Sequence, residues 1–378
     1  MSTMTTAPHS HGVPQLLTSG LRSYEPSDFE PVSTRQETWR FTPIALFEPL
    51  LEKLDGVTSV SVEPNFDPTQ VSIVTSAFSG DPVDGYVPTD RLASNIWRNA
   101  ANSTQIRVAR GAVVDAPINV TLASEKSASS SVLIIELEQE SQASVVIQHR
   151  GTAAQGSTII VTLGNAASAD ITLVQDTTAP IAVYAHHSLA RDSELKSAVV
   201  TLGGPCTRVV PTVACTGAGA DALLNGIALA GPGDHIEHRS LVNHEVPNCR
   251  SNVAYKNLLN GSADSPSRTV WIGDVIIHAA ALGTDTYELN RNPVIGDHAR
   301  ADSVPNLEIE TGEIAGAGHA SATGRLDDEQ VFYMQSRGIS ESEAKRLIVR
   351  GFFEDLLGQI KHESVVDSVR NRLEGLLG

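Results

Sequence analysis

Short runs rich in β-branched residues recur along most of this 378-residue chain. They follow one another at intervals of roughly 10 to 14 residues, and Gly, Ser, Asn, Asp and Pro separate them. No long helical pattern interrupts them, which argues against a doubly wound α/β sheet. The runs fall at 105–108, 118–122, 131–137, 143–149, 158–163, 170–175, 181–189, 193–201, 222–230, 235–246, 252–259 and 270–280.

This spacing suits sandwiches, barrels and solenoids alike. Aromatic residues make up only 4% of the chain, so the core must be built from Val, Ile, Leu and Ala in thin, regular layers. The chain also lacks the Cys, Trp, Cys arrangement of immunoglobulin-like sandwiches. This composition favours a parallel β-helix. No fixed coil length recurs, however, so periodicity alone leaves the sandwich open.

The residue pattern differs on the two sides of the β-rich part of the chain. We predict a disordered tail over residues 1–20, a mixed helical region over 21–104, a β core over 105–325 and a helical region over 326–378. Helices are expected near 46–55, at 90–97, at 327–337, after Ser340, and at the C-terminus. Ser340 and Glu343 form the capping box of the longest of these.

The formal net charge of -17 argues against a nucleic-acid or anionic-membrane binder, because such proteins need clustered Lys and Arg. No apolar run reaches membrane-spanning length, and the first residues carry no signal-peptide core. Three irregularly spaced cysteines do not make a disulfide framework. We therefore expect a cytoplasmic protein with reduced thiols.

Familiar catalytic motifs are missing from the sequence. It contains no GxxxxGK[ST] phosphate loop, no GxSxG elbow and no HExxH helix. We expect a non-catalytic scaffold, and nucleotide chemistry would have to come from a partner.

The densest set of potential metal ligands lies in the text HIEHRSLVNHEVPNC, which contains His235, His238, His244 and Cys249. Imidazole and thiolate together can hold iron or zinc. His235 and His238 are three residues apart, so on a strand their side chains point to opposite faces. The alternative is that these are solvent-facing histidines on a sheet.

Other His and Cys residues give weaker signals. Cys206 and Cys215 could share a site, but free cysteines in β-rich cores are usually inert, and we assign them a structural role. His186 and His187 are adjacent in a β run, so their side chains diverge. His319 differs from these, because small residues surround it at the boundary between the predicted strands and the predicted C-terminal helices.

Several motifs resemble the SufB/SufD family of iron-sulfur cluster assembly proteins. They are WRFTP from Trp39, YELNRNPV from Tyr287, PNLEIE from Pro305, the Gly-His pair ending at His319, and LDDEQVFYMQSRG from Leu326. The resemblance runs from about residue 39 to the end of the chain. It implies a right-handed parallel β-helix with helical N-terminal and C-terminal regions.

The resemblance also implies a function. Members pair as SufB with SufD, bind the SufC ATPase, and support cluster assembly, iron supply and transfer. SufB-like chains carry a Cys and a Glu where this sequence has Ala299 and Ala320, so the chain is most similar to SufD. His319 would then be the one cofactor-binding residue, a possible metal ligand at a site shared with SufB. Ala317 stands where SufD chains often have Cys.

With one imidazole and no nearby thiol, we expect no stably bound cofactor in this chain alone, because iron-sulfur clusters need several thiolate ligands. The cluster would form at the site shared with SufB, and ATP would act through SufC. Two rival interpretations remain: a β-helix enzyme acting on polyuronide carbohydrates, and a SufD-like homodimer that works without SufB.

Overall fold

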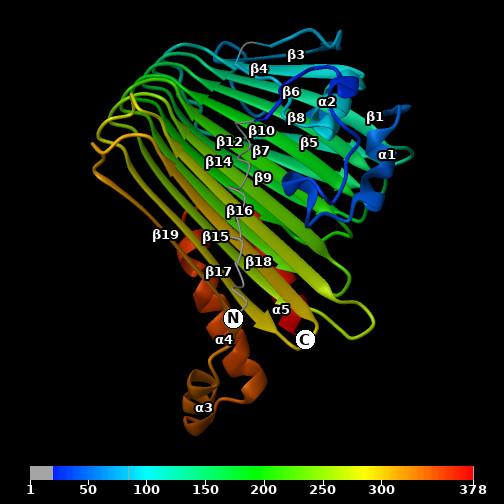
Figure 1. Ribbon diagram of the computed structural model, residues 1–378, viewed down its shortest axis with the longest axis vertical. Coiled ribbons are helices and arrows are strands. Elements are labelled where there is room, and N and C mark those ends of the chain that lie inside the picture. The colour runs from blue at the N-terminus through cyan, green and yellow to red at the C-terminus, as the bar shows by residue number, and fades with distance from the viewer. Residues whose placement is uncertain (1–19, 84, 378) are drawn as a thin grey trace, which may run out of the picture.

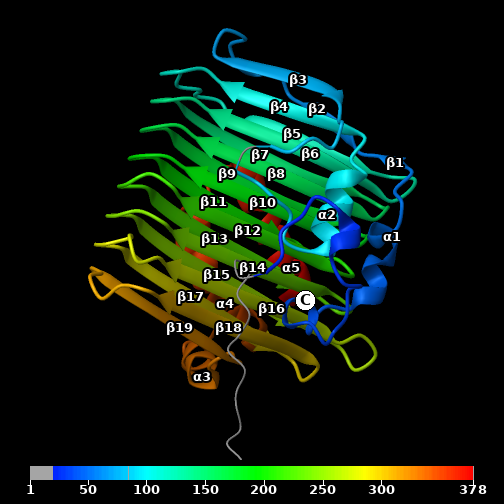
Figure 2. The same ribbon diagram turned by 45° about the horizontal axis from the view of Figure 1, so that its top comes forward.

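The computed structural model describes residues 20–83 and 85–377. The tail predicted over 1–20 lies, apart from Gly20, outside these residues. Two long sheets face each other, and each coil of the chain contributes one strand to each sheet (Figures 1 and 2). Apart from the first strands, neighbours within a sheet are parallel. The predicted parallel β-helix is confirmed.

From β4 onward the strands alternate between the sheets along the chain, whereas β3 and β4 both belong to sheet A. Sheet A contains β1 (Gly56–Val57), β3 (Val71–Ala77), β4 (Asn102–Val108), β6 (Ser129–Leu137), β8 (Gln155–Leu163), β10 (Ile181–Leu189), β12 (Thr207–Cys215), β14 (His235–His244), β16 (Ser267–Ile277) and β18 (Ala299–Ile309). Sheet B contains β2 (Ser59–Val62), β5 (Ile118–Ser124), β7 (Gln142–Gly151), β9 (Ser168–Thr177), β11 (Glu194–Thr201), β13 (Asp221–Ala230), β15 (Arg250–Asn260), β17 (Asp285–Ile295) and β19 (Gly316–Arg325).

The helices lie at the two ends of the chain. The N-terminal ones are η1 (Pro26–Asp28), η2 (Glu37–Trp39), η3 (Ile44–Phe47), α1 (Glu48–Leu51) and α2 (Arg91–Arg98). The C-terminal ones are α3 (Asp328–Ser336), α4 (Glu341–Leu357) and α5 (Glu363–Leu377). Among the described residues, none of them is long and apolar enough to cross a membrane.

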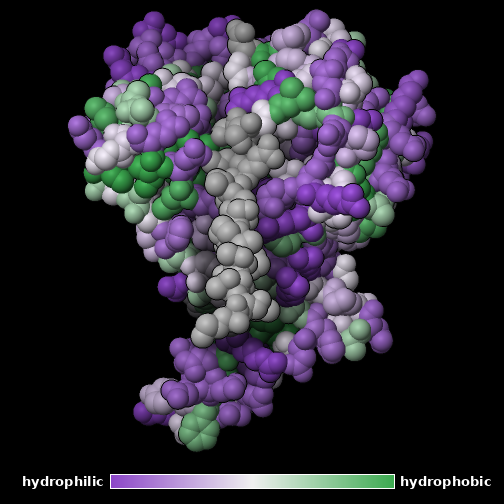
Figure 3. All heavy atoms as spheres, in the orientation of Figure 1, coloured by the Kyte–Doolittle hydropathy of each residue, from purple (hydrophilic) through white to green (hydrophobic). Residues whose placement is uncertain are grey.

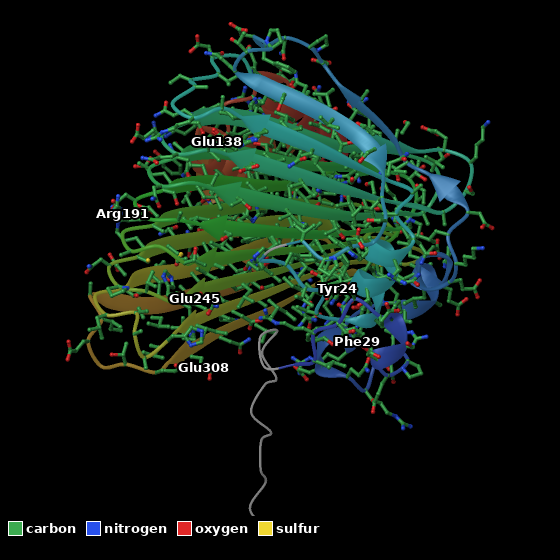
Figure 4. The ribbon with its side chains drawn as sticks, turned by 90° about the horizontal axis from the view of Figure 1, so that it is seen from above. Tyr24, Phe29, Glu138, Arg191, Glu245 and Glu308 are labelled. Atoms are coloured by element: carbon green, nitrogen blue, oxygen red, sulfur yellow. The ribbon has the colours of Figure 1, made fainter. Side chains whose placement is uncertain are left out.

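Alternating side chains of both sheets fill the space between them with a continuous apolar core. Ile159 and Val183 from sheet A and Ile171 and Leu224 from sheet B belong to it, and all are at most 1% exposed. The chain crosses from sheet A to sheet B through a row of turns that we call the turn edge. Glu138, Arg191, Glu245 and Glu308 mark this edge in Figure 4.

N-terminal elements cover the outer face of sheet A. Leu92, Ile96 and Phe47 pack there against Tyr184 and Val210. The predicted helix near 46–55 is shorter than expected, because only α1 and the 3-10 turn before it form. Proline before and within this segment removes the backbone donors that a longer helix would need.

A buried ionic cluster fixes the WRFTP segment to sheet A. The fully buried Arg208 pairs with Glu237, and its guanidinium carbon lies 4.2 Å from the centre of the Trp39 ring. Thr42 donates a 2.6 Å hydrogen bond to Glu237, and Arg239 binds the carbonyl of Thr38. The motif is therefore the strap that holds the N-terminal region on the solenoid.

Helices α4 and α5 cover the outer face of sheet B, behind the sheets in Figure 1. Val349, Phe353 and Leu373 from these helices pack against Val200 and Leu229 from the sheet. Ser340 caps α4 as predicted, since its hydroxyl accepts a hydrogen bond from the Glu343 amide. Helix α3 instead stands away from the sheets, at the bottom of Figure 1.

Candidate functional site

The last coil of the solenoid is an open end. Strands β18 and β19 are the final strands of sheets A and B, so each has one edge without a neighbouring strand in the described chain. Both lie at the lower end of the stack in Figure 2. His319 sits in β19, and its side chain is exposed. Free edges of this kind are natural surfaces for strand pairing with another chain.

His319 belongs to the inner row of sheet B. Its register partner on β17 is Glu288, which is buried inside the solenoid at 0% exposure. Neighbours in a parallel pair point to the same face, so the imidazole faces the end of the interior. A Cβ on Gly273 would come within 2.3 Å of the Trp271 ring and 2.6 Å of a Glu288 carboxyl oxygen, so glycine at this position leaves space for both side chains.

The Glu288 carboxyl group is unusual for a buried acid. Neither of its oxygens has a hydrogen-bond partner among the described residues. Burial, with a smaller contribution from Asp274, raises the pKa of Glu288 to about 8. The group is therefore largely protonated at neutral pH and can exchange a proton with a neighbour in the physiological range.

Behind Glu288 the row continues with the apolar Val253, but a second inward-facing row of sheet B is polar. The side-chain amide of Asn257 donates to Asn292 over 2.7 Å, and that of Asn292 donates to Thr323 on β19 over 3.0 Å. Deeper in, Thr201 lies 2.8 Å from Gln175 and 2.9 Å from His238. The inner face of sheet B thus carries two polar groups, and Ala228, the register partner of both Thr201 and Asn257, separates them.

We expect Glu288→Gln to change how stability depends on pH. The folded protein holds the Glu288 proton up to about pH 8, whereas the unfolded chain loses it near the ordinary value of 4.5. Wild-type stability should therefore fall as pH rises through this window. The variant should lose this pH dependence. Its unfolding free energy relative to wild type should therefore be more favourable at pH 8 than at pH 5, by on the order of 2–4 kcal/mol.

Denaturant unfolding at pH 5 and pH 8 measures the effect. Glu194→Gln, at an exposed position on the outer face of the same sheet, is the control and should behave as wild type. The same pH slope in wild type and in Glu288→Gln would contradict the buried protonated acid.

The four residues of the HIEHRSLVNHEVPNC text do not form one site. His235 and His238 point to opposite faces as predicted, but the expectation that they are solvent-facing is wrong. His238 is 1% exposed inside the solenoid, and burial lowers its pKa to about 3. His235 is half-buried, and burial lowers its pKa to about 4. The sequence shows neither the second sheet nor the strap, so it could not predict this burial.

The structure brings His244 and Cys249 together with a different residue, Cys215. Their ligand atoms all lie within 4.8 Å of one another, and all three side chains are buried. Cys206, which the sequence suggested as a partner of Cys215, instead packs beneath the N-terminal elements. No sequence spacing linked Cys215 to this pair, because the link is made by pairing between strands.

The adjacent histidines of β10 diverge as predicted. His187 is fully buried inside the solenoid, while His186 faces outward and lies 2.8 Å from the Thr212 hydroxyl. His186 lines a cavity of about 280 Å³ between sheet A and the N-terminal cover, with Tyr86 and Tyr184. Burial lowers the pKa of His186 to about 4, so its ring is neutral.

Charged residues also line a shallow depression on the outer face of sheet B, among them Glu194, Lys196, Asp221 and Arg250. Such a group is what a carbohydrate-active β-helix enzyme would need. Arg250 and Asp221 form an exposed ion pair at 3.1 Å, with side chains 67% and 42% exposed. Exposed paired charges are ordinary surface features and do not favour a catalytic pair.

Comparison with known proteins agrees with the motifs. A family model described as "SUF system FeS cluster assembly, SufBD core domain" matches residues 120–352. An iron-sulfur cluster assembly SufBD family protein of Mycobacterium tuberculosis is 41% identical over 364 residues, which cover 93% of this chain and 89% of the relative.

Two further relatives are more distant. The iron-sulfur cluster assembly protein SufD of Escherichia coli is 28% identical over 192 residues, which cover 50% of this chain and 44% of that protein. A second SufBD family protein of Mycobacterium tuberculosis is 27% identical over 180 residues, which cover 47% of this chain and 21% of that protein. One bacterium thus has two proteins of this kind, with different degrees of similarity to this chain.

Proposed function

This chain belongs to the SufBD family of iron-sulfur cluster assembly proteins, and from that premise we propose that it is the SufD-like subunit of an assembly complex. In the complex it pairs with a SufB-like chain, binds a SufC-like ATPase, and supports cluster assembly, iron supply and transfer. The observation that carries the proposal is the exposed His319 at the open end, beside the buried Glu288, whose carboxyl oxygens have no hydrogen-bond partner among the described residues.

Pairing with a second chain uses the free edges of β18 and β19. These strands are among the least covered of the solenoid, and Ile309 of β18 is 43% exposed. The two SufBD family proteins of Mycobacterium tuberculosis support a complex between different members of the family. The same edges could also pair two copies of this chain, which the experiment below distinguishes.

His319 contributes one nitrogen ligand or one proton-transfer group to the shared site. The three cysteines are buried and none lies on β17, β18 or β19, so the thiolates that hold a cluster come from the partner. Glu288, protonated at neutral pH, serves as the proton reservoir beside the imidazole. The cluster is then the product of the complex and not a resident group of this chain.

Hydrogen exchange with and without a SufB-like chain tests the pairing surface. Amides of residues 299–325 should become protected when the partner is added, while β2 and β3 at the opposite end should not change. Scattering mass should correspond to one copy of each chain. Binding with protection elsewhere, or a mass showing only two copies of this chain, would contradict the proposal.

Helix α3 is the docking surface for the ATPase. Phe332 and Tyr333 are 71% and 59% exposed, although they are large apolar side chains on a helix. Figure 3 shows apolar surface at the tip of the molecule formed by this region, within otherwise hydrophilic surroundings. Exposed aromatic side chains are frequent anchors of protein interfaces.

We expect the double variant Phe332→Ser, Tyr333→Ser to weaken ATPase binding by at least about tenfold, because each lost anchor costs 1 kcal/mol or more. Calorimetric titration of the variant with the SufC-like protein measures this affinity. Val74→Ser, 59% exposed on β3 at the other end, is the control and should bind as wild type. Removing the chain after Gly338 is a poorer test, since it would also strip α4 and α5 from sheet B.

A further inference from the structure

Three soft or borderline ligands meet at the turn edge, away from the open end. Cys215 is the last residue of β12 and His244 the last of β14, and the two are register partners in sheet A. Cys249 lies in the turn that leads from β14 to β15. Figure 4 labels Glu245, the residue after His244, on this edge. Two coils of the solenoid thus deliver the three side chains to one corner.

The three side chains lie close together and are shielded from solvent. One ligand atom from each of Cys215, His244 and Cys249 lies within 4.8 Å of the other two, and each residue is 0% exposed. Two thiolate sulfurs and an imidazole nitrogen around one metal ion need separations only slightly smaller than this. Small rotations of these side chains would bring the three ligand atoms to bonding distance from one metal ion.

His244 is already oriented as a metal ligand. Its Nε2 lies 2.9 Å from the Ser251 hydroxyl, which lies 2.7 Å from the Thr286 hydroxyl. Its Nδ1 is buried and has no hydrogen-bond partner among the described residues. Metal-binding histidines typically have one nitrogen fixed by such an outer hydrogen bond and the other free for the ion.

The thiols differ from ordinary buried cysteines. Each sulfur lies within 4.8 Å of the other and of an imidazole nitrogen, and Cys249 donates weak hydrogen bonds to the carbonyls of Gly217 and Pro247 over 3.4 and 3.7 Å. A buried thiolate is costly unless a cation compensates it. Cys206 is the contrasting case: it is equally buried, but it packs among apolar side chains, and it belongs to no group of three potential metal ligands among the described residues.

We infer that Cys215, His244 and Cys249 form a binding site for a divalent transition-metal ion of the Zn²⁺ type. Sulfur and imidazole ligands select zinc and similar borderline-soft ions over Mg²⁺ or Ca²⁺. The described residues supply three ligands, so the fourth tetrahedral position takes a water or a small thiol. The bound ion also links the ends of β12 and β14 to the turn that precedes β15. This site is separate from His319 and does not depend on the proposed function.

Metal titration of the reduced, metal-free, untagged full-length chain tests the site, with Zn²⁺ and a chromophoric competitor as the probe. We expect one equivalent to bind tightly. Cys215→Ser and Cys249→Ser should each lower the affinity at least about 100-fold. Ser251→Ala, which removes the outer hydrogen bond to His244 and the contact with Thr286, should lower it by about 10–100-fold. Cys206→Ser is the matched control and should bind as wild type.

X-ray absorption on the wild-type zinc complex gives a readout that does not depend on folding of the variants. Two sulfur neighbours at about 2.3 Å, with the remaining shell of nitrogen or oxygen, would support the site. A shell of nitrogen and oxygen only, sub-stoichiometric binding, or a Cys215–Cys249 disulfide in chain purified anaerobically would overturn it.

Discussion

Replacing His319 with alanine is expected to lower the cluster yield of the assembled complex by at least about tenfold, as is usual when a metal ligand or a proton-transfer group is lost. The fold should not change, because the side chain is exposed on the last strand of sheet B. Iron and acid-labile sulfide per complex, measured after anaerobic reconstitution with the SufB-like chain and the ATPase, give the yield.

The matched control for this variant is His298→Ala. His298 is another exposed histidine near the same end, in the turn before β18. The His298→Ala substitution should leave the cluster yield unchanged, and the circular dichroism spectra of the two variants should be the same. Equal yields in the two variants would remove His319 from the chemistry.

Replacing Glu237 with alanine is expected to lower the free energy of unfolding by about 3–5 kcal/mol. The change leaves Arg208 and Arg239, which are 0% and 3% exposed, without the carboxylate that both contact. It also removes the acceptor of the Thr42 hydroxyl. The strap formed by the WRFTP segment should detach first, so its amides should exchange faster.

Guanidinium unfolding measures the stability of this variant. Asp221→Ala, which breaks the exposed ion pair with Arg250, is the control and should cost less than about 1 kcal/mol. Similar losses in both variants would mean that the buried cluster is not what fixes the N-terminal region.

The strand runs that could be predicted are those in which β-branched residues dominate. The run at 181–189 coincides with β10, and most others differ from the observed strands by a few residues. Strands β1 to β3, which lie in the region predicted to be mixed helical, were missed, as were β12 and β17 to β19. Pro211 lies within β12, where it interrupts the ladder to β14, and β19 consists mainly of small residues.

The uneven coil length explains why periodicity could not separate solenoid from sandwich. Register partners in sheet A are 26 residues apart from Gln155 to Ile181 and again to Thr207. In sheet B, Ser251 and Thr286 are 35 residues apart. Longer turns absorb the difference, so the coils stack in register although the sequence repeat drifts. The family motifs were needed to decide the fold.

The candidate site was only partly visible in the sequence. His319 could be named from its motif, but its partner Glu288 could not. The one local signal was the alternation of Glu288, Asn290 and Asn292 within YELNRN, which predicts one polar face of a strand. That this face points inward is decided by the opposite sheet, where Gly273 leaves the space.

The cluster of Cys215, His244 and Cys249 could not be predicted from the sequence for a similar reason. The residues are 29 and 5 positions apart, and only the register between β12 and β14 brings the first beside the others. Coil length was not known from the sequence, so His244 and Cys249 were grouped with His235 and His238, their neighbours along the chain.

The most direct test of the central claim is anaerobic affinity purification of this chain from its native host, with identification of the bound proteins and assay of iron and sulfide. We expect a SufB-like chain and a SufC-like ATPase to co-purify, with iron and sulfide that the His319→Ala variant lacks. Recovery of the chain alone, without either partner and without iron, would contradict its role as a subunit of a cluster assembly complex.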